Sequence, residues 1–239
     1  MRLSIVDKLG FDGLVSLPYT SHNISQQSLS KEGFLISGLS LCDCPEMFGN
    51  GQRDGTVFTH RILDSAILSH RKVVVPIQLH SVMQQIYKSL NCVRDLSDCA
   101  DGIDCHSLKP NGEELGIRVD PISNAAMVFL RCPSRIDEFF ELISGNTYEK
   151  LSHISVSLDT ANPKSYGAIN RLLESRFIFS AVHPFAKTDL LTLQRISDLP
   201  GDIEKFVKLY PNQNESILND IVDMQRVSVL RARAQASDS

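Results

Sequence analysis

The chain has 239 residues, of which 42% are hydrophobic and 22% are charged, and its formal net charge is −4. This length allows one large domain or two small ones, and the apolar content is enough to build a core. Basic residues are not in surplus, so we do not expect nucleic acid or an anionic membrane to be the main partner.

The sequence also lacks the marks of an exported or membrane-spanning protein. No stretch approaches the roughly 20 consecutive apolar residues that a transmembrane helix needs. The N-terminal segment, M-R-L-S-I-V-D-K, reaches an acidic residue too early for a secretory signal. We therefore expect a cytoplasmic protein whose partner is a small molecule or another protein.

The first part of the chain predicts a strand, a helix and two further strands. The expected ranges are 14–17, 22–32, 34–41 and 57–63, in that order. Pro18 ends the first apolar run, and the helix is polar, with Ile24 and Leu29 as its only apolar residues. Gly33 is a natural residue after the end of a helix because it tolerates a positive φ angle. The Gly-, Asn- and Asp-rich stretch 45–55 indicates an exposed loop between the last two strands.

The next part predicts one buried strand and one amphipathic helix. The run V-V-V between Lys72 and Pro76 is the clearest buried strand of the sequence. Residues 80–90 follow as a helix, with Val82, Met83, Ile86 and Leu90 at helical spacing. Residues 91–113 are mostly polar, and we expect them to form a loop.

The remainder alternates strands and helices. The expected elements are a hairpin of 115–119 and 125–131, a helix at 135–143, a strand at 153–158, a helix that opens at Asn162, and strands at 177–182 and 189–196. Asn162 is expected to cap its helix, with Pro163 at the first helical position. After Gly201 the pattern predicts a short helix at 202–209 and a long amphipathic helix at 215–234.

The six cysteines are expected to be free thiols, because disulfides are rare in cytosolic proteins of this size. Cys42 and Cys44 stand two residues apart on an expected strand, which would place both thiols on one face. Cys99, Cys105 and His106 have ligand chemistry and lie in the polar stretch. No second pair follows at metal-binding spacing, so we expect no metal site.

Two distant segments of the sequence repeat one pattern. In each, a helix runs into a small or basic residue followed by Phe, as Gly33-Phe34 and Arg176-Phe177. A strand follows in each, with a Ser three residues after the Phe, at Ser37 and Ser180. The strand, helix, strand and strand expected between residues 153 and 196 therefore repeat the strand, helix, strand and strand expected between residues 14 and 63. This is the signature of a degenerate duplication at an offset near 143 residues.

The repeated unit resembles the C-terminal half of the GNAT acyltransferase fold. There a strand leads to a helix of the pattern N-x-x-A-x-x-x-Y-x-x-x-G-F, and a hairpin of strands follows. The second copy, N-P-K-S-Y-G-A-I-N-R-L-L-E-S-R-F, matches this pattern at Asn162, Ser165 and Phe177 and departs from it at Arg176. The first copy, H-N-I-S-Q-Q-S-L-S-K-E-G-F, places His22 at the Asn position and Ser25 at the small position.

The whole layout is similar to the tandem GNAT-like region found beside ATPase-type regulatory domains in some bacterial proteins. Three segments carry this likeness over residues 14–196: H-N-I-S-Q-Q, V-V-V-P-I-Q-L-H and D-L-L-T-L-Q. The resemblance implies an α/β (α+β) fold with two GNAT-like mixed-sheet units, the first of them incomplete, followed by C-terminal helices. The implied domains are the end of a first unit at 1–69, a second unit at 70–198 and a helical extension at 199–239.

The resemblance also implies an activity, the transfer of an acyl group from acetyl-CoA or another acyl-CoA to a small amine or hydroxyl. The implied catalytic residues are His22, Ser25 and Tyr166, and Asn162 and Ser165 are implied to bind the cofactor. In the family, a Gly-rich loop at a helix N-terminus grips the cofactor pyrophosphate with backbone N–H groups. A Tyr on the helix after the Asn often protonates the departing thiolate.

The sequence departs from the family at both of these features. No Gly-x-Gly segment stands between a strand and a helix, and the segment before the helix at 135–143 reads R-C-P-S-R. The position of the family's Tyr holds Leu29 in the first copy and Ile169 in the second, and Tyr166 lies about one turn earlier. The other candidate residues can also have purely structural roles. Asn162 can cap its helix, and Ser25 and Ser165 can be small residues that let a helix approach a sheet.

Two hypotheses about function follow. The first is an acyl-CoA-dependent acyltransferase. The second is a non-catalytic GNAT-like module, a pseudoenzyme that binds a small ligand or a protein partner. For the helix at 215–234 the apolar stripe allows three uses, which are cover for an open sheet edge, pairing in a homodimer, or packing against its own domain.

Overall fold

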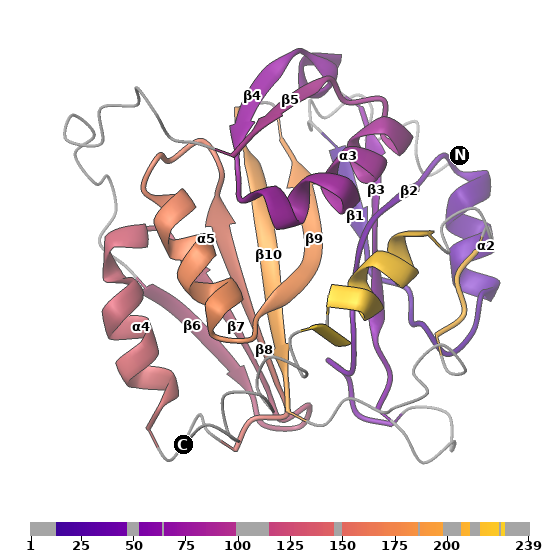
Figure 1. The fold of residues 1–239 in the computed structure, drawn as a ribbon. Coiled ribbons are helices and arrows are strands. Elements are labelled where there is room, and N and C mark those ends of the chain that lie inside the picture. The colour runs from indigo at the N-terminus through magenta and orange to yellow at the C-terminus, as the bar shows by residue number, and fades with distance from the viewer. Residues whose placement is uncertain are drawn as a thin grey trace.

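The computed structural model describes residues 13–46, 53–63, 65–98, 115–145, 150–185, 187–197, 207–210, 216–224 and 226–227. It shows an α+β protein with a mixed sheet of eight strands and a small parallel sheet of two strands (Figure 1). Several expected features lie outside these ranges: Cys99, Cys105, His106, residues 202–206 of the expected short helix and residues 228–234 of the expected long helix. In the part of the chain that is described, no helix is long and apolar enough to cross a membrane.

In the described residues, the first half of the fold contains three strands of the large sheet, the small sheet and two α-helices. Its elements are β1 Gly13–Ser16, α2 Ile24–Lys31, β2 Leu35–Ser40, β3 Thr56–Ile62, the 3-10 turn η1 Ser65–Leu68, β4 Arg71–Val74, the 3-10 turn η2 Ile77–Leu79, α3 His80–Ser89 and β5 Arg94–Ser97. Strands β4 and β5 pair in parallel, with α3 as the connection between them.

The second half supplies the other five strands of the large sheet. Its elements are β6 Leu115–Asp120, β7 Ala125–Leu130, the 3-10 turn η3 Pro133–Arg135, α4 Ile136–Ile143, β8 His153–Asp159, α5 Ser165–Glu174, β9 Ile178–Pro184 and β10 Asp189–Ile196. The order across the large sheet is β1-β3-β2-β9-β10-β8-β7-β6. Only β7 and β8 pair in parallel, and the other neighbours are antiparallel.

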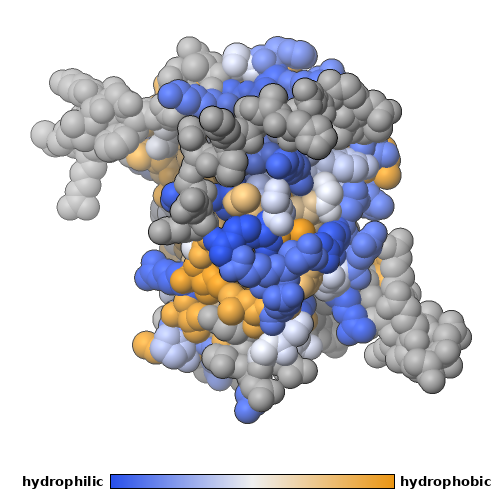
Figure 2. Space-filling model, turned by 90° about the vertical axis from the view of Figure 1, so that its left-hand side faces the viewer, coloured by the Kyte–Doolittle hydropathy of each residue, from blue (hydrophilic) through white to orange (hydrophobic). Residues whose placement is uncertain are grey.

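The helices α4 and α5 cover one face of this sheet, and in β7 the burial alternates accordingly. Val128 and Leu130 are buried, whereas Met127 and Phe129 on the opposite face are largely exposed. Figure 2 shows the side of the molecule that carries α4 and β6, where hydrophobic side chains gather among hydrophilic ones. The core therefore lies between the sheet and its helices.

Where the structure describes them, the expected elements are confirmed within a few residues, with three exceptions. Residues 207–209, the end of the expected short helix, are not helical. Residues 94–97, expected within a polar loop, form β5, whose backbone pairs with β4 although Leu96 is its only apolar residue. The expected strand through Cys42 and Cys44 ends at Ser40 instead, and Cys42 has a φ of 55°, which no regular strand allows. Both cysteines are free thiols, as expected.

The two halves of the large sheet repeat one arrangement, as the sequence predicts. The elements β1, α2, β2 and β3 have the same order and pairing as β8, α5, β9 and β10. The two sets meet where β2 runs antiparallel to β9, through the pair Gly38 and Ala181. These two residues are 143 positions apart, which is the offset of the sequence repeat.

The helix ends of the two halves are also the same. Gly33 and Arg176 both follow their helix with a left-handed backbone, at φ angles of 80° and 68°. In each half the next N–H group, that of Phe34 or Phe177, bonds back to a leucine carbonyl of the preceding turn at 3.0 Å. The Gly position of the pattern is therefore a true helix cap, which Arg176 occupies without the freedom of glycine.

Each half has a β-bulge at its repeated serine. The register between β2 and β3 skips Ser37, and the register between β9 and β10 skips Ser180. Both side chains are fully buried and bond to backbone carbonyls, Ser37 to that of Phe58 and Ser180 to that of Leu39. The small side chain at each bulge is thus buried with its hydroxyl hydrogen-bonded.

A buried glutamine fixes the junction between the halves. Gln194 of β10 donates to the carbonyls of Leu39 at 3.0 Å and Phe179 at 3.2 Å, and it accepts from the N–H of Leu41 at 2.9 Å. A single side chain thus joins β2, β9 and β10. Its amide offers both donors and an acceptor, which no apolar residue could replace without leaving backbone groups unpaired.

A buried ion pair fixes the small sheet to the large one. Asp189 at the start of β10 accepts from Arg94 of β5 at 2.6 Å and 3.0 Å, and from the hydroxyl of Tyr87 at 2.9 Å. The side chains of Arg94 and Asp189 are both fully buried. The acidic residue of the D-L-L-T-L-Q segment is therefore the anchor of β4, α3 and β5.

The C-terminal helix, residues 216–224 and 226–227, packs against its own chain. Four of its apolar side chains are buried: Ile217, Leu218, Ile221 and Val222. Asp220 on the same helix bonds to Ser81 and Gln85 of α3. Gln26 of α2 holds the segment before this helix through hydrogen bonds to the backbone of Lys208 and Tyr210. Of the three uses open to the helix, packing against its own domain is the one that the structure shows.

Candidate functional site

The catalytic residues implied by the GNAT resemblance do not come together. His22 and Ser25 lie at the start of α2, and Tyr166 lies in α5, and Figure 1 shows these two helices on opposite sides of the molecule. The carbonyl of His22 accepts a hydrogen bond from Gln26 at 3.1 Å. The hydroxyl of Ser25 is buried and has no hydrogen-bond partner within the described part of the chain.

The residues implied at the start of α5 have structural partners. The helix begins at Ser165, three residues after Asn162, whose side chain accepts from the N–H of Lys164 at 3.1 Å. Ser165 is fully buried and donates to the carbonyl of Asp159 at 2.6 Å. The hydroxyl of Tyr166 donates to Asp98 at 3.3 Å. The expectation that Asn162 caps this helix directly is thus wrong by two residues, because the cap position is Lys164 and the side chain of Asn162 closes the preceding turn instead.

The position of the phosphate-binding loop has no free row of N–H groups. Between β7 and α4 the chain forms the turn η3, where Pro133 is buried and has no N–H group to donate. The N–H of Arg135 bonds to the carbonyl of Cys132 at 3.0 Å, and its guanidinium pairs with Glu138. Ile169, at the position of the family's Tyr, is fully buried and carries no proton to donate.

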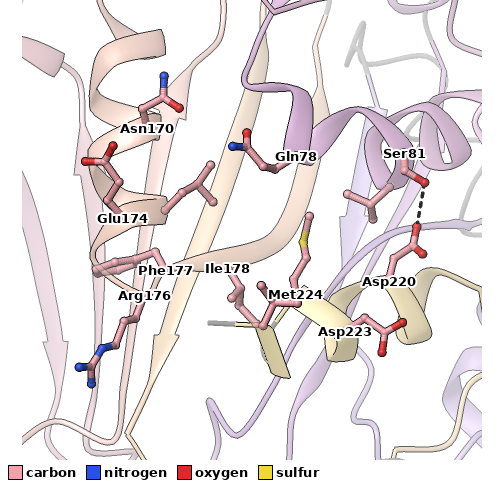
Figure 3. Close-up of a pocket in the computed structure, with 13 residues that line it drawn as sticks. Gln78, Ser81, Asn170, Glu174, Arg176, Phe177, Ile178, Asp220, Asp223 and Met224 are labelled. Carbon is pink, nitrogen blue, oxygen red and sulfur yellow. Dashed lines mark hydrogen bonds between the residues drawn. The ribbon is translucent and has the colours of Figure 1, made fainter. Parts of the chain in front are cut away.

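The structure has a groove of about 540 Å³ elsewhere, between α3, α5 and the C-terminal helix (Figure 3). Such a volume is typical of small-molecule sites. The residues that line the groove are Gln78, Ser81, Val82, Asn170, Leu173, Glu174, Arg176, Phe177, Ile178, Asp220, Asp223, Met224 and Val227. They come from α3 and the turn before it, from the end of α5 and the strand after it, and from the C-terminal helix.

The groove has an apolar floor and a polar rim. Leu173, Phe177, Ile178 and Met224 provide hydrophobic and aromatic surface against which an apolar group can pack. Figure 3 shows Gln78, Ile178 and Met224 between the walls of the groove.

Asp220 is the charged group that the groove holds in place. One of its oxygens accepts from the hydroxyl of Ser81 at 3.3 Å (Figure 3) and from the amide of Gln85 at 2.8 Å. Both donors are neutral. Within the described residues the other oxygen has no partner, and no cation pairs with this carboxylate. The groove therefore offers a positioned anionic acceptor next to apolar surface.

This groove lies at the opposite end of α5 from the residues implied to bind acyl-CoA. Leu173 and Glu174 are in the last turn of the helix, whereas Ser165 begins it, about 12 Å away at 1.5 Å per residue. The offset that relates the halves places Ser30 at the position of Leu173, so this apolar residue of the groove has no apolar equivalent in the first half.

Sequence reasoning missed this groove. Met224 and Val227 belong to the apolar stripe that the sequence predicts for the C-terminal helix, and Leu173 is an apolar residue of the predicted α5. The apolar stripe indicated that one face of the C-terminal helix is buried. Nothing local could show that it stops short of α5 and leaves a cavity, because that depends on the path of residues far apart in the chain.

A second polar cluster lies on the sheet, and it is buried. The hydroxyl of Ser37 and Nδ1 of His60 are 2.7 Å apart, and the rings of His60 and His183 are centred 5.1 Å apart. Burial lowers the pKa of His60 to about 3, with a further lowering from the charge of His183, and lowers the pKa of His183 to about 4. Both are therefore neutral at pH 7, and the full burial of Ser37 keeps substrate from its hydroxyl.

The described residues hold no group of three or more His, Cys, Asp or Glu side chains arranged for a metal ion. In the comparisons with known proteins, no family model, curated protein or solved structure matches this chain.

Proposed function

We propose that this chain is a GNAT-like binding module that holds a small ligand in the groove between α3, α5 and the C-terminal helix, and that it does not catalyse acyl transfer. The order of β8, α5, β9 and β10 supports the fold part of this proposal, since a strand, a helix and a strand hairpin are what the resemblance implies. The groove is the observation that carries the binding part.

The absence of catalysis is supported by the positions that would do the chemistry. Proton donation to a leaving thiolate needs an ionisable group, and Ile169 offers none. A pyrophosphate needs several converging donors, and the turn 133–135 within the described chain begins with a proline and uses the N–H of Arg135 internally. One serine or tyrosine side chain does not replace such a set of backbone donors.

Acyl transfer is the second candidate function, and one observation favours it. Tyr166 is on α5, the helix that would lie along the cofactor, and its hydroxyl lies 3.3 Å from a carboxylate oxygen of Asp98. This hydrogen bond would orient the hydroxyl, which in acyl transfer would give its proton to the departing thiolate.

Thermal-shift titration with acetyl-CoA separates the two candidates. We expect no change in melting temperature up to 1 mM acetyl-CoA, because a ligand that does not bind the folded state cannot stabilise it. A saturable rise in melting temperature that disappears in Tyr166→Phe or Asn162→Ala would contradict the proposal and favour the enzyme.

The groove itself is tested with neutral aromatic fragments observed by saturation-transfer NMR. Val227 is about half exposed at the rim, so Val227→Trp should fill the groove without disturbing the core. We expect fragments to bind the wild type and to lose binding in this variant. Ile122→Trp is the matched control, because Ile122 is 82% exposed on the turn between β6 and β7, away from the groove. Equal binding by both variants would remove the groove as the site.

A further inference from the structure

We propose that the ligand of the groove is a small organic cation, with an apolar body on the floor and an ammonium group bound to Asp220. This inference deepens the proposed function and rests on it. It is carried by the juxtaposition of an apolar cavity with a carboxylate that is fixed by neutral donors and has an oxygen to spare.

The first step is the state of Asp220. A carboxylate beside a cation would already be compensated, but the partners of Asp220 within the described chain are the hydroxyl of Ser81 and the amide of Gln85. Their hydrogen bonds hold the side chain in one orientation and, because both donors are neutral, do not cancel its charge. Its second oxygen can then accept from a ligand N–H.

The second step is the sign of the other charges at the rim. Glu174 and Arg176 are opposite in sign and exposed, and Figure 3 shows the guanidinium of Arg176 directed away from the other labelled residues. Asp223 already pairs with Arg226 at 3.2 Å. The positioned and uncompensated charge is therefore the negative charge of Asp220, which attracts a cation and repels phosphates such as those of acyl-CoA.

The third step is the chemistry of the floor. Leu173, Ile178 and Met224 offer contact surface but no hydrogen-bond donor or acceptor other than the weakly accepting thioether. A ligand body that packs on these three side chains is apolar, since a polar group placed there would lose its hydrogen bonds to water without replacement. An amine that carries an alkyl or aromatic chain fits both parts of the groove.

The test uses three probes with one body and different head groups: phenylbutylamine, phenylbutanol and phenylbutyrate. Affinities for the full chain are measured by isothermal titration calorimetry at low salt. We expect the amine to bind about tenfold more tightly than the alcohol, and the acid to bind most weakly. In Asp220→Asn the amine should fall to the level of the alcohol, whereas the affinity of the alcohol should stay within about twofold.

Glu141→Gln is the matched control, because it removes one negative charge from α4, where Glu141 is exposed and does not line the groove. It should leave the advantage of the amine unchanged. The head-group series in the wild type, repeated at high salt, gives a second measurement that does not depend on any variant, and the advantage of the amine should shrink there.

The outcomes separate this inference from the proposed function. If the three probes bind equally and Val227→Trp blocks all three, the groove is a ligand site but the cationic ligand is wrong. Tightest binding by the acid, or an unchanged amine affinity in Asp220→Asn, would also overturn the inference alone. If no probe binds the wild type, both the cationic ligand and the groove as a small-molecule site are overturned.

Discussion

Gly38 and Ala181 are paired across β2 and β9, and this contact joins the two halves of the sheet. A Cβ atom at Gly38 would lie 2.3 Å from the carbonyl oxygen of Ser180 and 2.3 Å from Cα of Ala181. Both atoms belong to the backbone and cannot move as the end of a side chain can. The closeness of the two halves therefore depends on the absence of a side chain at one position.

Gly38→Ala should lower the free energy of unfolding by about 3 kcal/mol or more, because the two central strands must separate to admit the methyl group. Gly116→Ala is the control in the same sheet, since a Cβ there would meet Cβ of Phe129 at an ordinary 3.7 Å. Urea denaturation of both variants measures the difference. A cost for Gly38→Ala that equals the cost for Gly116→Ala would refute the close approach.

Arg176 should be replaceable by glycine with a gain in stability. Its φ of 68° is unfavourable for a residue with a Cβ atom, and the equivalent position of the first half is Gly33. We expect Arg176→Gly to raise the free energy of unfolding by about 0.5–1 kcal/mol and Gly33→Ala to lower it by about 1 kcal/mol. Denaturant titrations in which both substitutions shift stability in the same direction would argue against a shared cap.

Asp189 should be among the least replaceable polar residues. Asp189→Asn leaves the fully buried guanidinium of Arg94 without its counter-charge, and we expect a loss of about 3–5 kcal/mol. The control is Asp137→Asn, which breaks an ion pair with Arg171 at the surface and should cost about 0.5 kcal/mol. Thermal unfolding followed by circular dichroism compares them. Similar melting temperatures for the two variants would show that the buried pair is not a structural anchor.

Stability should fall as the pH falls from about 6.5 toward 4. The pKa values of His60 and His183 are lowered to about 3 and about 4 in the folded chain by burial, and for His60 also by the charge of His183. In the unfolded chain both titrate near 6.5. Between these values the unfolded state binds more protons, so each histidine contributes a slope of up to about 1.4 kcal/mol per pH unit.

This pH dependence is measured by urea denaturation at pH values between 4 and 7. His183→Gln should flatten the slope by about 1 kcal/mol per pH unit, because it removes one of the histidines whose pKa burial lowers. His70→Gln removes an exposed histidine and should leave the slope as it is. An unchanged slope in His183→Gln would mean that other groups govern the loss of stability in acid.

The sequence by itself determined the elements and their repetition. Period-two and helical spacing located β3, β7, β8, β9, β10, α3, α4 and α5, because these patterns reflect which side chains of a segment are buried. The repeated pattern also indicated where α2 and α5 end, whereas the bulges at Ser37 and Ser180 were not expected and are features of the strand pairing.

The tertiary structure decided what joins these elements. Strand β5 carries almost no local signal, and it exists because β4 lies beside it and Arg94 meets Asp189, which is 95 positions away. The groove has the same origin, since Leu173, Ser81 and Asp220 become neighbours only when α5, α3 and the C-terminal helix pack together. Local patterns specify which face of a segment is buried, but a cavity is set by long-range packing that no single segment contains.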